Sequence, residues 1–359
     1  MELNIFGGFY QGKRVLVTGH TGFKGSWLVL WLRTLGAEVA GLALDPDTSP
    51  AHWSLLGLDG LVDCRVDLRD KEAVGAVVKS FQPDMIFHLA AQPLVRRSYR
   101  DPESTFSTNI LGLVNLLEVV RDCPSVRVLI NATTDKVYAE HTIPSGYCEG
   151  DPLGGHDPYS SSKACAELLT DCYRKSFFDG DTTRLATVRA GNVIGGGDWA
   201  EDRLVPDLVR AASTKKALFI RNPAAIRPWQ HVLEPLSGYL RLGQLLWNDA
   251  SLAKSWNFGP GRGGEIPVQS LTERLASHWD ALQICHDVNP QPHESDTLRL
   301  NACAAQLQLG WMPVWDIDES ALRTSSWYRA FYEQRYVRSL QDLNAYVQSA
   351  QDLGLEWAR

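Results

Sequence analysis

Three glycines spaced three residues apart constrain this chain more than any other feature of its 359 residues. They form the pattern GHTGFKG, which directly follows the apolar run Arg14–Val17 and opens a stretch of helical length, Ser26–Leu35. A strand that turns tightly into a helix needs glycine at the turn and where helix and strand pack closely. The free backbone N–H groups at the start of such a helix bind phosphate. The pattern predicts a dinucleotide-binding loop formed by Gly19, His20, Gly22, Phe23, Lys24 and Gly25.

Strand-like and helix-like stretches alternate through the first half of the chain. The apolar runs are Arg14–Val17, Val39–Leu44, Met85–Leu89, Val126–Ile130 and Ala186–Arg189, and the helical stretches are Ser26–Leu35, Ala73–Ser80, Thr108–Arg121 and Ser160–Phe178. This alternation predicts an α/β fold, a Rossmann-type doubly wound parallel sheet. Strands that are apolar throughout are typical of a sheet covered on both faces.

The amino-acid composition changes after about Gly195, where proline and tryptophan become frequent. We expect residues 1–194 to form an NAD-binding Rossmann domain and residues 195–359 a smaller, mainly substrate-binding α/β region, part of which returns to the sheet. The stretch Gly259–Pro267 is expected to be a loop, and Asp318–Arg359 is expected to be mostly helical.

An acid at the end of the second run bears on the choice of cofactor. Asp45 follows Val39–Leu44, where a carboxylate accepts a hydrogen bond from a ribose 2′-hydroxyl and repels a 2′-phosphate. This favours NAD over NADP. Two alternatives stay open: Asp45 is a turn residue before Pro46, or Lys24 accepts a 2′-phosphate. Asp67 suits the adenine edge, although a helix N-cap would look the same.

Tyr159 and Lys163 stand one helical turn apart in PYSSSK, on the same face of the predicted helix. A tyrosine with its ordinary pKa of ~10 is a poor base at neutral pH. A neighbouring ammonium and a positive nicotinamide stabilise the phenolate and lower that pKa. An isolated pair with this spacing is more often a surface pair, so the glycine loop upstream carries much of the argument.

Polar residues follow the run Val126–Ile130 in the sequence NATTDK. The carboxyl end of a strand in a parallel sheet faces the ligand crevice. We therefore expect Thr134, Asp135 and Lys136 to lie near Tyr159. The alternative is an ordinary polar loop.

Charge and cysteine content exclude several classes of protein. The chain carries 35 Lys and Arg against 42 Asp and Glu, a net charge of −7, which argues against a nucleic-acid partner. No apolar run approaches the ~18 residues of a membrane span, and the N-terminus lacks the pattern of a signal peptide. The seven cysteines lack ligand or disulfide-framework spacing, so we expect no metal site and a reduced, cytoplasmic protein.

A local excess of positive charge lies between residues 203 and 227, with six Lys and Arg against one acid. Because arginine binds phosphate through two parallel donors, this excess favours a diphosphate-bearing substrate. Lys215 and Lys216 are expected on a solvated helix face.

Several motifs carry a resemblance to a known family. TGHTGFKG, HLAAQ, TTDKVY and PYSSSK resemble the extended short-chain dehydrogenase/reductase superfamily. The longer stretches AAQPLVRRSY, DPYSSSKACAEL, RAGNVIGGGDWAEDRLVPD and RNPAAIRPWQHVLEPLSGYL are similar to its 4,6-dehydratases for CDP-sugars. The resemblance covers roughly residues 10–315.

The resemblance implies a reaction in which tightly held NAD oxidises C4 of a hexose, water leaves across C5–C6, and hydride returns to C6. Tyr159 would take the O4 proton, Lys163 would hold the phenolate and ribose, and Thr134 would hydrogen-bond O4. Asp135 and Lys136 would be the acid–base pair for the elimination. An ordinary lysine pKa of ~10.4 leaves a lysine protonated, so Lys136 as a base would need burial.

The resemblance also extends the list of binding residues. His20 would lie near the reacting end, or would merely cap the loop. Further cofactor contacts are expected from Leu68, Ala90 and Ala91 beside the glycine loop, Asp45 and Asp67. The substrate, CDP-glucose, is expected to contact Gln92, Asn192, Arg203, Arg221, Arg227 and His231.

Two other functions stay open at this point. One is a 4-epimerase or a dehydratase acting on a dTDP-, GDP- or UDP-hexose; Asp135-Lys136 argues against an epimerase, which needs no such pair. The other is an NAD-binding sensor or scaffold, against which the retained Tyr159 and Lys163 argue. Superfamily members pair the helices that match Thr108–Arg121 and Ser160–Phe178, so we expect a homodimer or higher homo-oligomer, with apolar contacts from Leu116, Val119, Leu168 and Leu169.

Overall fold

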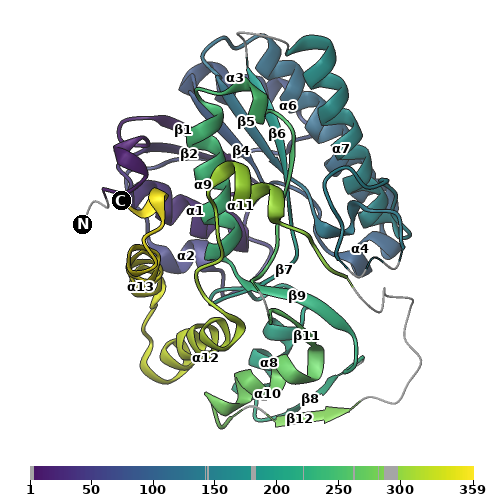
Figure 1. Ribbon diagram of the computed structural model, residues 1–359, viewed down its shortest axis with the longest axis vertical. Helices are drawn as coiled ribbons and strands as arrows, with labels where there is room; N and C mark the ends of the chain where they lie inside the picture. The colour runs from purple at the N-terminus through teal and green to yellow at the C-terminus, as the bar shows by residue number, and fades with distance from the viewer. Residues whose placement is uncertain are drawn as a thin grey trace.

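A seven-stranded sheet forms the centre of the computed structural model, which describes residues 4–141, 143, 145–178, 183–220, 222–261, 263–281, 283–286 and 298–359. All six strand pairings are parallel, in the order β10-β6-β5-β4-β1-β2-β3 (Figure 1). The prediction of a doubly wound parallel sheet is confirmed. Its strands are β1 Arg14–Thr18, β2 Glu38–Ala43, β3 Val62–Arg65, β4 Met85–His88, β5 Val128–Ala132, β6 Arg184–Ala190 and β10 Ser255–Phe258.

Helices cover both faces of this sheet. Buried Leu16, Ile86 and Leu129 pack in the core that includes residues of α3, α6 and α7, whereas Val15 and Val17 pack in the core that includes residues of α1 and α9. Because neighbouring residues of one strand enter opposite cores, the strands are apolar throughout. The helical segments that precede and surround the sheet are η1 Phe6–Gly8, α1 Phe23–Thr34, α2 His52–Leu56, α3 Lys71–Phe81, α4 Val95–Arg100, α5 Pro102–Phe106, η2 Ser107–Leu111, α6 Gly112–Arg121, η3 Asp135–Val137, α7 Pro158–Phe177, α9 Leu233–Leu246 and η4 Ala250–Leu252.

The expected helix Thr108–Arg121 is part of a longer helical run. The run starts at Pro102, passes through the π turn η2 and continues as α6. At Gly112 the run lies so close to Leu68 that a Cβ would be 2.9 Å from the Leu68 Cβ.

A second region lies below the sheet in Figure 1. It contains a three-stranded sheet in the order β11-β9-β7, a parallel pair β12-β8, and two helices. The prediction that Gly259–Pro267 is a loop is wrong for its last three residues, which form β11 and pair with β9. These elements are β7 Asn192–Ile194, α8 Leu204–Ser213, β8 Ala217–Ile220, β9 Ile226–His231, β11 Glu265–Pro267, α10 Val268–Ser277 and β12 Gln283–His286.

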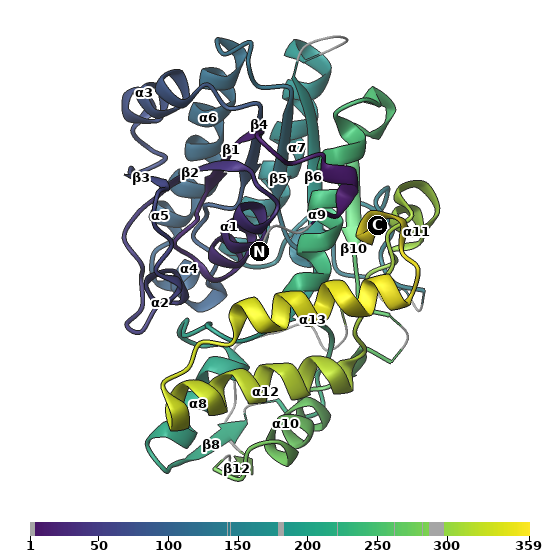
Figure 2. The same cartoon turned by 90° about the vertical axis from the view of Figure 1, so that its left-hand side faces the viewer.

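The C-terminal part is helical and returns to the first domain (Figure 2). Trp31 of α1 packs edge-on against Tyr346 and Trp357, and Phe6 stacks on Trp357 with ring centroids 5.2 Å apart. This aromatic cluster joins both ends of the chain to α1. The elements are α11 Cys303–Leu309, α12 Ile317–Gln334, α13 Ser339–Asp352 and η5 Glu356–Ala358. Among the described residues, no helix combines the length and apolarity needed to cross a membrane.

Candidate active site

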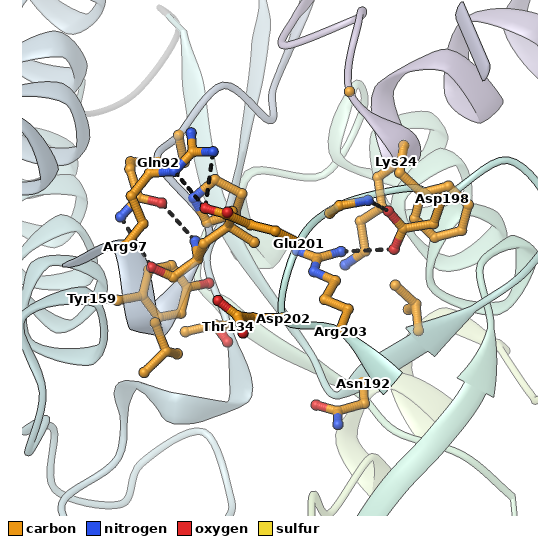
Figure 3. A pocket seen from close by; sticks show the side chains of 18 of the residues that line it. Lys24, Gln92, Arg97, Thr134, Tyr159, Asn192, Asp198, Glu201, Asp202 and Arg203 are labelled. Carbon is orange, nitrogen blue, oxygen red and sulfur yellow. Dashed lines mark hydrogen bonds and ion pairs between the residues drawn. The ribbon is translucent and has the colours of Figure 1, made fainter. Parts of the chain in front are cut away.

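A cavity of about 1180 Å³ lies where the carboxyl ends of the central strands meet the second region. Its lining includes the glycine loop, the residues after β5, the start of α7, and residues 190–194 and 197–207. Ligands of doubly wound sheets bind at this edge. Figure 3 shows side chains that line the cavity.

The glycine loop leaves room for a ligand because its glycines pack against backbone. Gly19 has a φ of +74°, and a Cβ there would lie 2.6 Å from the Ala90 backbone nitrogen. At Gly25 a Cβ would lie 2.1 Å from the Gly19 carbonyl oxygen. Gly22 precedes α1 and offers no side-chain cap to its first N–H groups. The loop and these N–H groups fit a pyrophosphate.

Acid–arginine pairs mark the side of the cavity where we expect the adenosine. Asp45 lies 3.3 Å from Arg65 Nε, and its side chain is 86% exposed. Asp67 binds Arg69, whose hydrogen bonds lower the pKa of the Asp67 carboxyl. The N-cap of α3 is Asp70, so Asp67 does not have the capping role. Leu68, Ala90 and Ala91 line the same cavity.

His20 does not lie at the reacting end, so that expectation is wrong. Its side chain is fully buried and absent from the cavity lining, with Nε2 2.9 Å from the Asp63 carboxylate. The ring lies against Gly41, where a Cβ would come within 2.4 Å of it. Positive φ at Gly19 turns the chain so that His20 enters the space beside β2, behind the loop.

Lys24 extends into the cavity from the first turn of α1. Its Nζ lies 3.5 Å from the Tyr239 hydroxyl, close enough to Asp135 and Arg203 for their charges to act on it. Burial, with Arg203, Lys163 and Lys136, lowers the pKa of Lys24 to about 7. Lys24 therefore belongs to the catalytic side of the cavity and not to the Asp45 side, where a 2′-phosphate would lie.

Tyr159 and Lys163 line the cavity from the first two turns of α7. Burial raises the pKa of Tyr159 to about 12, although a hydrogen bond with Thr134 and the charge of Arg203 act in the opposite direction. Lys163 donates to the Ala132 carbonyl at 2.9 Å, and burial lowers its pKa to about 8. A positive charge beside the hydroxyl lowers the pKa of a tyrosine, and an oxidised nicotinamide bound here would add such a charge.

Asp135 and Lys136 form a pair at the end of β5, on η3. Asp135 is 1% exposed; its Oδ1 accepts from Thr134 Oγ1 and from Lys136 Nζ, both at 3.0 Å. Its Oδ2 is buried without a hydrogen-bond partner. Lys136 is partly exposed and also donates to Asn192 at 3.4 Å. The burial expected of a neutral lysine base is therefore absent, and Asp135 is the group with a free oxygen.

The predicted substrate residues are only partly brought together. Asn192, Arg203 and Arg227 line the cavity, and Arg203 binds Asp198 at 3.2 Å. Gln92 also lines it, but its amide is engaged by Leu94 and Thr105. Arg221 lies outside the described residues.

His231 does not reach the cavity, so its assignment to the substrate is wrong. It is 1% exposed, packs edge-on against Trp27 and Trp315, and accepts a hydrogen bond from the Leu233 N–H. Burial lowers its pKa to about 3. His231 shares one side of β9 with Arg227 and Trp229, which line the cavity, but at the end of the strand Trp27 and Trp315 cover that side.

Sequence reasoning missed an ion-pair group at the mouth of the cavity. Arg97 of α4 binds Asp47 at 2.7 Å and Glu201 at 3.2 Å, and Arg100 binds Glu201 at 2.9 Å. Figure 3 shows Arg97 and Glu201 joined in this way. The group links the loop after β2, α4 and the second region. The doubled arginines of LVRRSY and the acids of WAED were the available signal.

No group of three or more potential metal ligands occurs among the residues that the structure describes.

Comparisons with known proteins agree with this geometry. Residues 15–248 match the model of the NAD dependent epimerase/dehydratase family. The chain is 44% identical over 349 residues to the CDP-glucose 4,6-dehydratase of Salmonella typhimurium, covering 94% of this chain and 97% of that protein. It is 27% identical to a probable dTDP-glucose 4,6-dehydratase of Sinorhizobium fredii, over 88% of this chain and 92% of that one.

A solved structure with a similar fold is the UDP-glucose 4-epimerase of Thermus thermophilus in complex with NAD. It has a TM-score of 0.74 and 27% identity, over 88% of this chain and 99% of that one. The family match covers well over half of this chain. The chain therefore belongs to the NAD dependent epimerase/dehydratase family.

Proposed function

We propose that this protein is an NAD-dependent dehydratase that converts CDP-glucose to CDP-4-keto-6-deoxyglucose. The observation that carries the proposal is the Asp135–Lys136 pair, which lines the same cavity as Tyr159 and Lys163 and in which Asp135 Oδ2 has no hydrogen-bond partner. An epimerase needs the tyrosine–lysine pair but no second acid–base pair. The preference for CDP is supported by the similarity to the Salmonella typhimurium enzyme.

The cofactor proposal rests on the glycine loop and the uncapped first turn of α1. These groups would hold the pyrophosphate of NAD, while Asp45 would accept from the ribose hydroxyls and Asp67 would lie at the adenine. When bound, NAD would supply the hydride acceptor for C4 of the sugar and the hydride donor for C6.

The residues of this chain would move the protons. Tyr159 accepts the O4 proton as C4 is oxidised, with Thr134 at O4 and Lys163 close to the phenolate. The resulting 4-ketone acidifies the C5 proton, which Asp135 removes through its free oxygen. Lys136 then protonates the departing O6 hydroxyl, which fits an ammonium that is already paired with Asp135 at 3.0 Å.

The diphosphate and nucleotide would lie toward the second region. Asn192, Arg203 and Arg227 supply polar and positive groups there. Leu218, Ala225 and Val268 line the same end and offer apolar surface for a base. We therefore assign the substrate mainly to the part of the chain after residue 194, with β10 and α9 serving the sheet.

Oligomerisation belongs to the same proposal. Leu116 and Val119 are buried inside the subunit, contrary to the expectation that they form an outer contact. Leu168 is 60% exposed and shares the outer face of α7 with exposed Cys165 and Cys172. We propose that this apolar stripe packs against the same helix of a second copy.

All seven cysteines are free thiols, which supports a reducing, cytoplasmic location.

The test is incubation of the protein and NAD with CDP-, dTDP-, GDP- and UDP-glucose, followed by the absorbance of 4-keto-6-deoxy sugars in alkali. We expect product with CDP-glucose well before any other nucleotide sugar. A galactose product with any of them, or no reaction with CDP-glucose, would contradict the proposal.

A further inference from the structure

A buried ion pair lies directly behind the catalytic residues, outside the cavity. Glu167 of α7 and Arg189 of β6 are each 2% exposed, and neither lines the cavity. Arg189 Nη2 donates to Glu167 Oε2 at 2.8 Å and Nε donates to Oε1 at 3.0 Å. Burial of two charges is costly even when they are paired, so such a pair calls for a functional reason.

Glu167 accepts hydrogen bonds from three hydroxyl groups besides the guanidinium. The donors are Thr133, at the end of β5, Thr187 of β6 at 2.7 Å and Ser255 of β10 at 3.1 Å. Thr133 immediately precedes Thr134, whose side chain lowers the pKa of Tyr159 and whose hydroxyl donates to Asp135 Oδ1 at 3.0 Å. One end of the catalytic segment is therefore attached to Glu167.

Arg189 holds the other end of the same segment. Its Nη1 donates to the Tyr138 hydroxyl at 2.8 Å and to the Glu149 carbonyl at 3.1 Å. The Tyr138 hydroxyl donates in turn to Asn257 at 2.7 Å. Between Thr133 and Tyr138 lie Thr134, Asp135 and Lys136.

We propose that the Glu167–Arg189 pair positions the residues of the two catalytic steps through separate contacts. Through Thr133 the pair holds Thr134 for the oxidation, and through Tyr138 it holds Asp135 and Lys136 for the elimination. The inference rests on the proposed function, because it assigns the two ends of one segment to two steps of one reaction. Both residues act through others and are positioning residues.

Glu167 has a second effect, on Lys163 one turn before it. The charged and titratable groups that act on Lys163 or respond to it are Glu167 on α7, His88 on β4 and Lys24 on α1. Burial lowers the pKa of Lys163, and Glu167 raises it again. The carboxylate thus helps to keep Lys163 an ammonium beside the phenolate.

The first test is Glu167→Gln, which removes the charge and keeps the shape. The pH profile of single-turnover oxidation, followed as reduced-cofactor absorbance, should lose rate at its alkaline end at a lower pH than in the unaltered protein, because the pKa of Lys163 is lower without the Glu167 charge. A variant that is merely less stable would lose amplitude at every pH without moving that limb. If the alkaline end of the pH profile does not move in Glu167→Gln, the electrostatic effect of Glu167 on Lys163 is overturned.

The second test does not depend on that variant folding. Thr133→Val should slow oxidation about tenfold and leave elimination from the 4-keto sugar within about twofold, and Tyr138→Phe should do the reverse. Elimination is measured as deuterium exchange at C5 together with 4-keto-6-deoxy product. Matched controls are Thr324→Val and Tyr346→Phe, which remove buried hydroxyl hydrogen bonds in α12 and α13. Glu234→Gln is the control for Glu167→Gln, since Glu234 is a buried acid remote from the cavity lining.

Each outcome decides one question. If Thr133→Val and Tyr138→Phe slow both steps equally, or neither, the positioning role is overturned while the proposed function stands. If the unaltered protein forms no 4-keto-6-deoxy product, the proposed function has failed first, and the variants say nothing in its favour.

Discussion

Two proton-transfer groups share the cavity at the residue scale. We propose that Tyr159 with Lys163 acts at O4 and that Asp135 with Lys136 acts at C5 and O6. The first group comes from α7 and the second from η3 after β5, so a side chain of either group can be substituted separately. This separation makes the two steps individually measurable.

Lys136→Ala and Tyr159→Phe should therefore stop the reaction at different points. We expect Lys136→Ala to oxidise C4 and then stall, so that reduced-cofactor absorbance persists on the enzyme, while Tyr159→Phe binds NAD but gives almost no such absorbance. General acid–base groups of this kind contribute about 10²–10⁴ in rate. Single-turnover absorbance at the NADH band separates the two variants. Equal slowing of both steps in Lys136→Ala would show that Lys136 only neutralises or orients Asp135.

We expect Asp45 to favour NAD over NADP, and its neighbour Arg65 bears on that expectation. Arg65 lies 3.3 Å from Asp45 and also pairs with Asp63 at 2.8 Å, so removal of Asp45 leaves an arginine with one carboxylate fewer, better able to bind a 2′-phosphate. Asp45→Ala should narrow the preference for NAD over NADP by about tenfold or more.

Asp45→Asn is the informative partner variant, because it keeps a hydrogen-bond acceptor and loses the repulsion. Dissociation constants for both dinucleotides provide the measurement. If NADP binding is unchanged in Asp45→Ala, the acid is a turn residue, as its exposure would also allow.

Some residues could be placed from the sequence and others could not. Tyr159, Lys163 and Asp135 follow from helical spacing and from the position after a strand. His20 and His231 could not be placed, because a side chain beside a glycine turn or on a short strand can enter either the cavity or the core. Arg65 is contributed by β3, a strand that the apolar pattern did not predict, since three of its four residues are exposed.

At the scale of elements, α1 is the part that joins the loop, the catalytic chamber and the C-terminal helices. Its Ser26 hydroxyl lies 2.7 Å from His52 Nδ1, and His52 Nε2 lies 2.7 Å from the Ser339 hydroxyl at the start of α13. The ring must stay neutral to donate on one side and accept on the other. Burial lowers the pKa of His52 to about 3.

His52 therefore makes stability depend on pH in a defined direction. The unfolded chain binds a proton near pH ~6.5, and the folded chain does not until about pH 3, so stability falls as the pH drops below ~6.5. His88 and His231 have pKa values lowered to about 3 for the same reason and add to the slope. Each of these three histidines changes the free energy of unfolding by up to about 1.4 kcal/mol per pH unit.

His52→Gln should lower the melting temperature at pH 8, through the loss of a buried hydrogen bond, yet flatten its decline between pH 6.5 and 4.5. Thermal unfolding of both proteins across that range provides the measurement. Parallel curves would show that His52 is not neutral in the folded protein.

Most elements of the first domain could be predicted because burial on both faces leaves continuous apolar runs. The strands of the second region were harder to predict from the sequence, because they are three to six residues long and some contain proline, as in β9 and β11. The contribution of β10 to the central sheet depends on a chain reversal through α9, which no local pattern records.

At the scale of the whole molecule, the exposed stripe of α7 leads us to expect a dimer. Light scattering at micromolar concentration should give a mass near 80 kDa, twice the 39.9 kDa of one chain. Leu168→Glu should give the single-chain mass, because a carboxylate would be buried against its own copy. Leu353→Glu is the matched control, since Leu353 is 59% exposed and lies beyond α13. A single-chain mass for the unaltered protein would remove this part of the account.

The most direct test of the central claim follows one hydrogen atom. CDP-glucose that carries deuterium at C4 is incubated with the protein and NAD, and the product is analysed by NMR. We predict a 4-keto-6-deoxy sugar with the deuterium at C6, because the hydride that leaves C4 returns after water has been eliminated across C5–C6. Deuterium retained at C4 of a hexose with altered stereochemistry would identify an epimerase and contradict the role assigned to Asp135 and Lys136.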